Sequence, residues 1–109
     1  MITAIVRFAL PQPLTPQAAK EVFLATAPRY RDLEGLLRKY YILSEDGRTA
    51  GGVYLWRSRE DADRAYSPQW RDFVRGKYGC EPSVEYFASP VVVDNLAGAI
   101  VTDDPTPVR

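Results

Sequence analysis

The sequence predicts an α+β fold in which a four-stranded antiparallel sheet carries its helices on one face. Three observations support this prediction. Four segments have the alternating or strongly apolar character of strands. A hairpin signal joins two of these segments, and the other intervals contain helix-capping residues followed by apolar residues at helical spacing. The resulting order is strand, helix, strand, strand, helix, strand, which is the split βαβ arrangement.

The predicted strands cover residues 2–10, 35–44, 49–57 and 83–95. The dipeptide Asp46-Gly47 suits a tight turn with positive φ, so it joins the second and third strands into a hairpin. We expect the fourth strand to bend at Pro90, because proline cannot donate to a sheet ladder. Side chains alternate between the faces of a strand, so one face of the first strand carries Ile2, Ala4, Val6 and Phe8.

Hydroxyl side chains precede the predicted helices, where they accept hydrogen bonds from the first free backbone N–H groups. We expect Pro28 to kink or end the first helix, because it lacks a backbone donor, and Gly79 to end the last one. The ordinary interpretation of the apolar face of the last helix is core packing by Trp70, Phe73, Val74 and Tyr78. The helix starts are Thr15 before Pro16, Ser58 with Asp61 three residues later, and Ser67 before Pro68.

The composition indicates one ordinary globular domain. The chain has 109 residues, 46% of them hydrophobic and 26% charged. We assign residues 1–95 to a single domain and residues 96–109 to a C-terminal tail that is flexible or wraps a partner. Lysine plus arginine equals aspartate plus glutamate, at 14 each, which favours neither nucleic acid nor a membrane as partner. No apolar run approaches the ~20 residues of a membrane span, and the N-terminus reads as a strand rather than a leader, so we expect a cytoplasmic protein.

The chain contains no histidine and one cysteine, Cys80, for which we expect a buried or half-buried packing role. These counts exclude a Ser-His-Asp or Cys-His catalytic arrangement, a histidine-ligated haem and the usual zinc sites. We therefore expect no metal and no cofactor. Any catalysis uses the remaining polar and charged side chains or the reactivity of the substrate itself.

The predicted sheet is apolar on both faces, whereas its helices cover only one. Ile5 lies on the second face of the first strand, and the second and fourth strands carry apolar residues on each face. An apolar face of this size has to be covered. We therefore expect a homodimer with the two sheets packed face to face. Arg7 lies within the apolar first strand, where it forms an ion pair at the dimer interface or contacts a ligand.

Two adjacent glycines, Gly51 and Gly52, interrupt the third strand just before Tyr54 and Trp56. Glycine weakens a strand interior, so the pair needs a reason. One interpretation is a bulge or a close approach of a helix backbone. The other places Gly52, Tyr54 and Trp56 towards the helices, where the missing side chain leaves a hollow beside two aromatic rings, suited to a small molecule.

The segment 35–66 combines Gly35-Leu36, Lys39, Ala50-Gly51-Gly52 followed by Tyr54, Trp56, and Ala65-Tyr66. This combination resembles the YdhR family of small monooxygenases, within the dimeric α/β-barrel (ferredoxin-like) superfamily. The element order extends the resemblance over residues 1–95. It implies a cofactor-independent oxygenase acting on a small aromatic or polyketide-like compound. The superfamily also includes cyclases, isomerases and proteins of unknown role.

On this basis we assign catalytic roles to Lys39, Tyr54 and Tyr66. Lys39 stabilises a phenolate or, once desolvated, acts as the base; its neighbour Arg38 is the alternative cation. Tyr66 or Tyr40 donates a hydrogen bond to an oxyanion. Substrate binding is assigned to Gly52, Trp56, Tyr40, Trp70 and Phe8.

Other interpretations remain open at this stage. A cyclase or isomerase on the same scaffold would need only proton transfer, and a binding protein would need no chemistry at all. Lys39 also suits a surface position or an ion pair with a carboxylate such as Glu85. Trp56 suits a core or dimer contact as well as a ligand contact.

Overall fold

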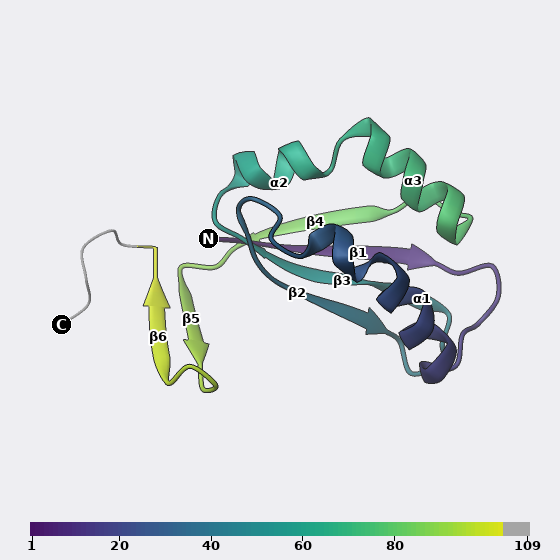
Figure 1. The fold of residues 1–109 in the computed structure, drawn as a ribbon, viewed down its shortest axis with the longest axis horizontal. Coiled ribbons are helices and arrows are strands. Elements are labelled where there is room, and N and C mark those ends of the chain that lie inside the picture. Colours follow the sequence, from purple (N-terminus) through teal and green to yellow (C-terminus); the bar gives the residue numbers. More distant parts are fainter. Residues whose placement is uncertain (104–109) are drawn as a thin grey trace.

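The computed structural model describes residues 1–103 and confirms the α+β fold (Figure 1). Cys80 is half-buried, as expected. Within residues 1–103, every helix is too short or too polar to cross a membrane. The elements in chain order are β1 (Ile2–Ala9), α1 (Pro16–Tyr30), β2 (Leu36–Leu43), β3 (Thr49–Trp56), α2 (Arg59–Ala65), α3 (Pro68–Tyr78), β4 (Ser83–Ala88), β5 (Val91–Asp94) and β6 (Ala99–Thr102).

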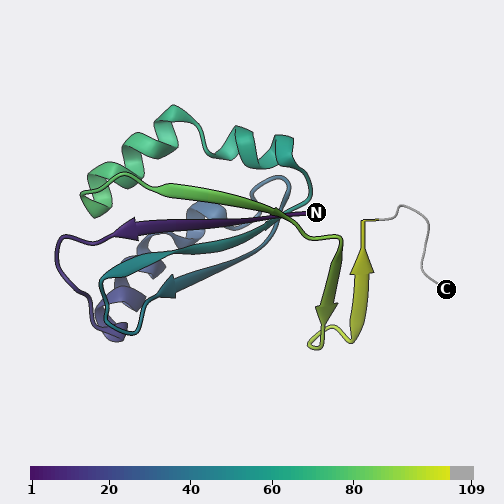
Figure 2. The ribbon, with the colours of Figure 1, turned by 180° about the vertical axis from the view of Figure 1, so that it is seen from behind.

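The four long strands form one antiparallel sheet in the order β2-β3-β1-β4. Strands β1 and β3 are therefore central, and β2 and β4 are the edges. Helices α1, α2 and α3 cover one face of this sheet, and viewed from behind the strands lie in front of α1 (Figure 2). We call the opposite face of the sheet the outer face.

The hydrophobic core lies between the sheet and the helices. The register pairs Ala4 with Tyr54, Val6 with Gly52 and Phe8 with Ala50, so the inward face of β1 continues onto β3. This confirms that the face of β3 carrying Gly52, Tyr54 and Trp56 points towards the helices. Helices α2 and α3 contribute Ala62, Trp70 and Val74 to the same core, and Tyr66 joins them from the end of α2.

The helix starts agree with the capping residues in the sequence. Thr15, Ser58 and Ser67 accept hydrogen bonds from backbone N–H groups three residues later, at 3.1, 3.2 and 3.1 Å. Gly79 ends α3 with a φ of 76°. Pro28 was expected to kink or end the first helix. It does not end the helix, because α1 continues to Tyr30. Proline removes one hydrogen bond near the end of the helix, and this exposed position leaves the freed carbonyl to water.

The expectation of one bent strand over residues 83–95 was wrong. The structure contains two strands in different sheets: β4 pairs with β1, whereas β5 pairs with β6 in a separate hairpin. The ladder of β4 ends where Ala88 faces Ile2, the first residue of its partner strand. Pro90, which lacks an N–H group, then separates the two strands. Residues 104–109 of the expected tail lie outside the described residues, so its flexible or wrapping role stays a prediction.

The β5–β6 hairpin, which we call the arm, stands apart from the main sheet next to the start of β1 (Figure 1). Arg38 of β2 forms an ion pair with Asp94 of the arm, and Thr3 is hydrogen-bonded to Ser89. Sequence reasoning treated residues from Leu96 onward as tail. The sequence did contain a signal for the second strand of the arm: the apolar segment 99–102 follows Gly98, which forms a turn with a φ of 66°.

Gly51 lies where the backbones of β1 and β3 approach closely. A Cβ atom at this position would lie 1.8 Å from the carbonyl oxygen of Val6, a distance that requires the backbone to move. The backbone that approaches Gly51 is thus that of the neighbouring strand β1 and not that of a helix, and this explains why the central strands tolerate no side chain there.

Replacing Gly51 with alanine is expected to destabilise the protein by about 2–3 kcal/mol, because the new methyl group overlaps the backbone of β1. Gly76→Ala is the matched control, since Gly76 lies within α3 and a Cβ atom added there would meet no atom within 4 Å. We expect that control to stabilise the protein by about 0.5–1 kcal/mol. Urea denaturation followed by circular dichroism measures both changes. Equal effects of the two substitutions would contradict the assignment.

Candidate functional site

Lys39 extends from β2 into a group of three tyrosine rings. Its position opposite Tyr54 in the register places it on the face of the sheet that packs against the helices. Its Nζ atom lies 3.4 Å from the ring centroid of Tyr30, 3.8 Å from that of Tyr41 and 4.6 Å from that of Tyr54. We call these three residues the tyrosine cage. They come from α1, β2 and β3, so the cage forms only when helix and sheet are packed together.

Gly52 provides the space for the Lys39 side chain. A Cβ atom on Gly52 would lie 3.1 Å from Cε of Lys39 and 2.9 Å from Cε1 of Tyr54. The hollow expected at Gly52 therefore exists in the backbone, but the lysine chain and the tyrosine ring occupy it. The two glycines therefore serve different purposes. The missing side chain at Gly51 lets strand β1 approach, and the missing side chain at Gly52 leaves space for Lys39.

Burial changes the acidity of the groups in this region. Desolvation, together with the smaller effect of the positive charge of Arg29, lowers the pKa of Lys39 to about 7. About half of the Lys39 side chains are therefore neutral amines at pH 7. Burial raises the pKa of the Tyr54 and Tyr66 phenols, so both stay protonated and can donate hydrogen bonds at neutral pH.

The cage cation has no carboxylate partner within the described part of the chain. The ion pair between Lys39 and Glu85 is not formed, because Glu85 lies on the outer face and pairs with Arg7 at 3.0 Å. Arg7 thus makes its ion pair within the protomer, between neighbouring strands. Cation–π attraction to the rings is what remains to stabilise the charged form of Lys39.

Hydrogen bonds fix the rings that surround Lys39. The indole of Trp70 donates to the Tyr30 hydroxyl at 3.0 Å. The Tyr41 hydroxyl is bonded to Thr26 of α1 at 2.8 Å. The Tyr54 ring stacks parallel to the Trp56 ring, with the two ring centroids 6.0 Å apart. The cage is therefore held rigidly by α1, α3 and β3.

The space inside the core beside Lys39 is too small for a substrate. It measures about 10 Å³, which is room for one water molecule at most. Among its lining residues are Phe8, Lys39, Tyr54 and Trp70. An organic ligand therefore does not fit on the inner side of the lysine.

A larger pocket opens beside Lys39 at the edge of the sheet, between the end of α1 and the edge strand β2. Its volume is about 370 Å³, within the range of small-molecule sites. We call it the edge pocket; it is lined by Ala27, Tyr30, Arg31, Asp32, Leu36, Leu37, Arg38, Lys39 and Tyr41. Two of the three cage rings thus face a space in which an aromatic ring can lie against them.

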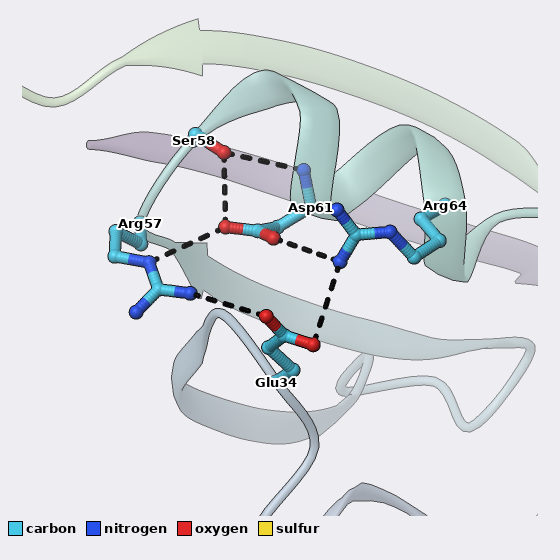
Figure 3. A network of polar contacts seen from close by, with 5 residues as sticks. All are labelled: Glu34, Arg57, Ser58, Asp61 and Arg64. Atoms are coloured by element: carbon cyan, nitrogen blue, oxygen red, sulfur yellow. Dashed lines mark hydrogen bonds and ion pairs between the residues drawn. The ribbon is translucent and has the colours of Figure 1, made fainter.

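A network of polar contacts holds the loop between α1 and β2, whose residues Arg31 and Asp32 line the edge pocket (Figure 3). The buried Asp61 carboxylate accepts hydrogen bonds from Ser58 at 2.9 Å and from Arg64 at 3.0 Å. The hydrogen bond from Ser58 is the main cause that lowers the pKa of Asp61. Glu34 of the loop reaches Arg57 and Arg64 at 4.0 and 3.9 Å. The network therefore ties the loop between α1 and β2 to the start of α2.

The structure brings some of the sequence-assigned site residues together and separates others. Lys39, Tyr54, Gly52, Phe8 and Trp70 meet around the cage. Tyr66 lies one layer deeper, where its hydroxyl accepts a hydrogen bond from the Trp56 indole at 3.0 Å, and neither ring lines the edge pocket. Tyr40 lies on the outer face opposite Val53 and is 55% exposed.

Sequence reasoning missed Tyr30 and Tyr41, which make the two shortest ring contacts to the Lys39 ammonium. A signal for Tyr41 was available: it lies two residues after Lys39 in the same strand, so both side chains point to one face. No sequence pattern indicates Tyr30, because its contact with Lys39 depends on how the end of α1 packs on β2.

No family model and no curated protein matches the sequence. Solved structures are similar in fold. A monooxygenase from the gene ActVA-Orf6 of Streptomyces coelicolor, crystallised with the ligand nanaomycin D, is 20% identical, with a TM-score of 0.63 over 84% of this chain and 89% of that chain. SnoaB, a cofactor-independent oxygenase from Streptomyces nogalater, is 18% identical, with a TM-score of 0.60 over 81% and 91% of the two chains.

A third similar structure is Rv0793 from Mycobacterium tuberculosis, which is 22% identical with a TM-score of 0.57 and covers 81% of this chain and 93% of that chain. An antibiotic biosynthesis monooxygenase also matches, with a TM-score of 0.57. At these identities the similarity shows the fold. The chain shares the α+β architecture of these solved structures.

The lowered pKa of Lys39 predicts a pH dependence of stability. The folded protein releases the Lys39 proton near pH 7, whereas the unfolded chain holds it until about pH 10.4. The unfolded state therefore binds more protons between these values, so stability rises with pH. Relative to Lys39→Met, the free energy of unfolding of the wild type should rise by about 2 kcal/mol from pH 7 to pH 9.

Urea denaturation of both proteins at pH 6, 7, 8 and 9 measures this difference. The matched control is Lys20→Met, which removes an exposed lysine from α1 and should run parallel to the wild type. A Lys39→Met curve that also runs parallel to the wild type between pH 7 and pH 9 would show that Lys39 is not desolvated.

Proposed function

We propose that the protein is a cofactor-independent monooxygenase that acts on a small aromatic or polyketide-like compound. The observation that carries this proposal is a lysine of lowered pKa, caged by tyrosine rings, beside a pocket of about 370 Å³. The fold supports it, because SnoaB has the same architecture and is described as a cofactor-independent oxygenase. The resemblance of segment 35–66 to the YdhR family narrows the proposal to that group.

The reaction needs an electron-rich substrate, since the protein supplies no redox centre in this scheme. The neutral Lys39 amine takes the proton of a phenol bound in the edge pocket, and the phenolate then transfers electrons to dioxygen. A phenol and dioxygen yield a quinone and water, so the substrate itself provides all four electrons that dioxygen consumes. The protein contributes proton removal, stabilisation of the anion and fixed geometry.

The residues around the cage take distinct roles. Lys39 is the base, and after protonation its ammonium pairs with the phenolate. Tyr54 is a positioning residue, because its ring contacts the Lys39 ammonium from the core side and does not line the edge pocket. Tyr66 is a positioning residue that holds Trp56 behind Tyr54. Gly52 leaves room for the lysine chain, while Phe8 and Trp70 close the inner side.

We also propose that the protein is a homodimer formed through the outer face. Among the residues of that face, Tyr40 is 55% exposed and Phe87 is 45% exposed, and Ile5, Val53 and Leu55 are half-buried around them. The arm adds exposed Val93 and Leu96 beside this face, with a groove of about 360 Å³ between arm and sheet. Apolar surface of this extent favours cover by a second sheet.

The oxygenase proposal is tested by oxygen uptake with a panel of phenols. Lys39→Met should lower the rate at least about 100-fold, because it removes the base, and Lys39→Arg should not restore it. Lys20→Met should retain the wild-type rate. The rate should rise through pH 7 as Lys39 loses its proton and level off above pH 8.

Absence of uptake across a broad panel would overturn the oxygenase proposal. Turnover under strict anaerobiosis would instead identify a cyclase or isomerase, which needs only proton transfer. Saturable binding with no product in mass spectrometry would identify a binding protein.

Light scattering tests the dimer. At micromolar concentration we expect a mass twice the 12.3 kDa of one chain. Tyr40→Glu places a charge on the outer face and should shift the mass towards the monomer. Leu24→Glu introduces the same charge at a residue that is 60% exposed on α1 and should leave the dimer intact. A wild-type monomer would refute the dimer.

A further inference from the structure

We propose that Lys39 is a nucleophilic amine that forms a reversible imine with aromatic aldehydes bound in the edge pocket. This inference rests on the site proposed above but not on its reaction with dioxygen. It assigns the chain a covalent chemistry of its own, carried by one side chain and the pocket beside it.

The surroundings of Lys39 leave the lone pair of its neutral form unengaged. Within residues 1–103, the Nζ atom faces three ring planes and has no carboxylate within ion-pair distance. Its neighbour in β2, Arg38, instead forms an ion pair with Asp94. An amine that donates to no acceptor and loses its proton near neutrality is available as a nucleophile.

The amine is also open to the edge pocket. Every fully buried polar side-chain atom in the described part of the chain has a hydrogen-bond partner. The Nζ atom of Lys39 has ring faces in place of such partners, so it is not sealed in the core. Lys39 lines the edge pocket together with the Tyr30 and Tyr41 rings, and that pocket is the way in.

The pocket favours a flat aromatic aldehyde over an aliphatic one. Its walls include Tyr30 and Tyr41, whose rings offer stacking and edge contacts to a second ring. A carbonyl carbon attached to a ring held there lies next to the lysine nitrogen. The same rings exclude much of the water that would compete for the carbonyl group.

The step is balanced without an oxidant or a reductant. The Nζ lone pair attacks the carbonyl carbon and forms a C–N bond, while the π pair moves to oxygen, which takes a proton. The nitrogen loses a proton and the carbinolamine then loses water, which leaves the C=N bond of the imine. Hydrolysis reverses the sequence and returns the free amine.

The chain provides its own controls, because it contains three lysines and two of them, Lys20 and Lys77, are exposed. The wild-type protein is treated with benzaldehyde and cyanoborohydride at pH 7 under nitrogen, and peptide mass spectrometry locates the reduced adducts. Neutral amine makes up about one half of Lys39 and about one part in 2,500 of an ordinary lysine. We expect at least about tenfold more adduct on Lys39 after allowance for access through the pocket.

The pH profile gives a second signature. Adduct on Lys39 should rise about tenfold from pH 6 to pH 8 and then level off, whereas adduct on Lys20 and Lys77 should keep rising with pH. Propanal should show a smaller preference for Lys39 than benzaldehyde. In urea the preference should vanish. The α-amino group, which is partly neutral at this pH in any chain, is scored separately.

Equal adduct on the three lysines of the folded protein would overturn the inference. Lys39→Arg, which keeps the charge but lacks the nucleophile, should remove only the adduct on the peptide containing position 39. Because labelling is measured without oxygen, its failure and the failure of the oxygenase proposal are separate results. Selective labelling without oxygen uptake supports the imine alone.

Discussion

The absence of side chains at Gly51 and Gly52, in the central strand β3, is the constraint on which the sheet and the site both depend. At Gly51 it lets the backbone of β1 come close enough for the central ladder to form. At Gly52 it lets Lys39 lie across the sheet under the tyrosine rings. Two neighbouring positions thus serve opposite faces of one strand. The core, the cage and the wall of the edge pocket all follow from this local arrangement.

The surroundings of Lys39 have two opposing effects on the stability of its charged ammonium form. Removal from water disfavours the charged form of Lys39, and no carboxylate within the described residues offsets this cost. The ring faces attract the cation, and a desolvated cation–π contact is worth about 2 kcal/mol, yet the pKa of Lys39 is still lowered to about 7. Desolvation therefore prevails, and the lysine is balanced between its two protonation states near neutral pH. This balance is what makes the group suitable for proton transfer, and a surface lysine on the same strand would lack it.

Most of the fold follows from local signals, and the site follows only in part. Capping hydroxyls at Thr15, Ser58 and Ser67 and the alternation in β1 and β3 are properties of short segments, so the sequence reveals them. The contact between Tyr30 and Lys39 depends on the angle at which α1 lies on β2, which no short segment encodes. The closing of the hollow at Gly52 was missed for the same reason: the filling side chain comes from another strand. Pro90 was seen, but whether it bends a strand or ends it depends on where the partner β1 begins.

The neighbours Arg38 and Lys39 hold the edge strand β2 from both sides. The guanidinium of Arg38 binds Asp94 of the arm on the outer face, while the amine of Lys39 is enclosed on the inner face. A slip of β2 by one residue would exchange the two, leaving a guanidinium in the space that Gly52 provides and the arm without its ion pair. Edge strands are the part of a sheet most prone to shift or to pair with another chain. The contacts of Arg38 and Lys39 therefore favour one register of this edge strand, and that register is the one that places Lys39 in the site.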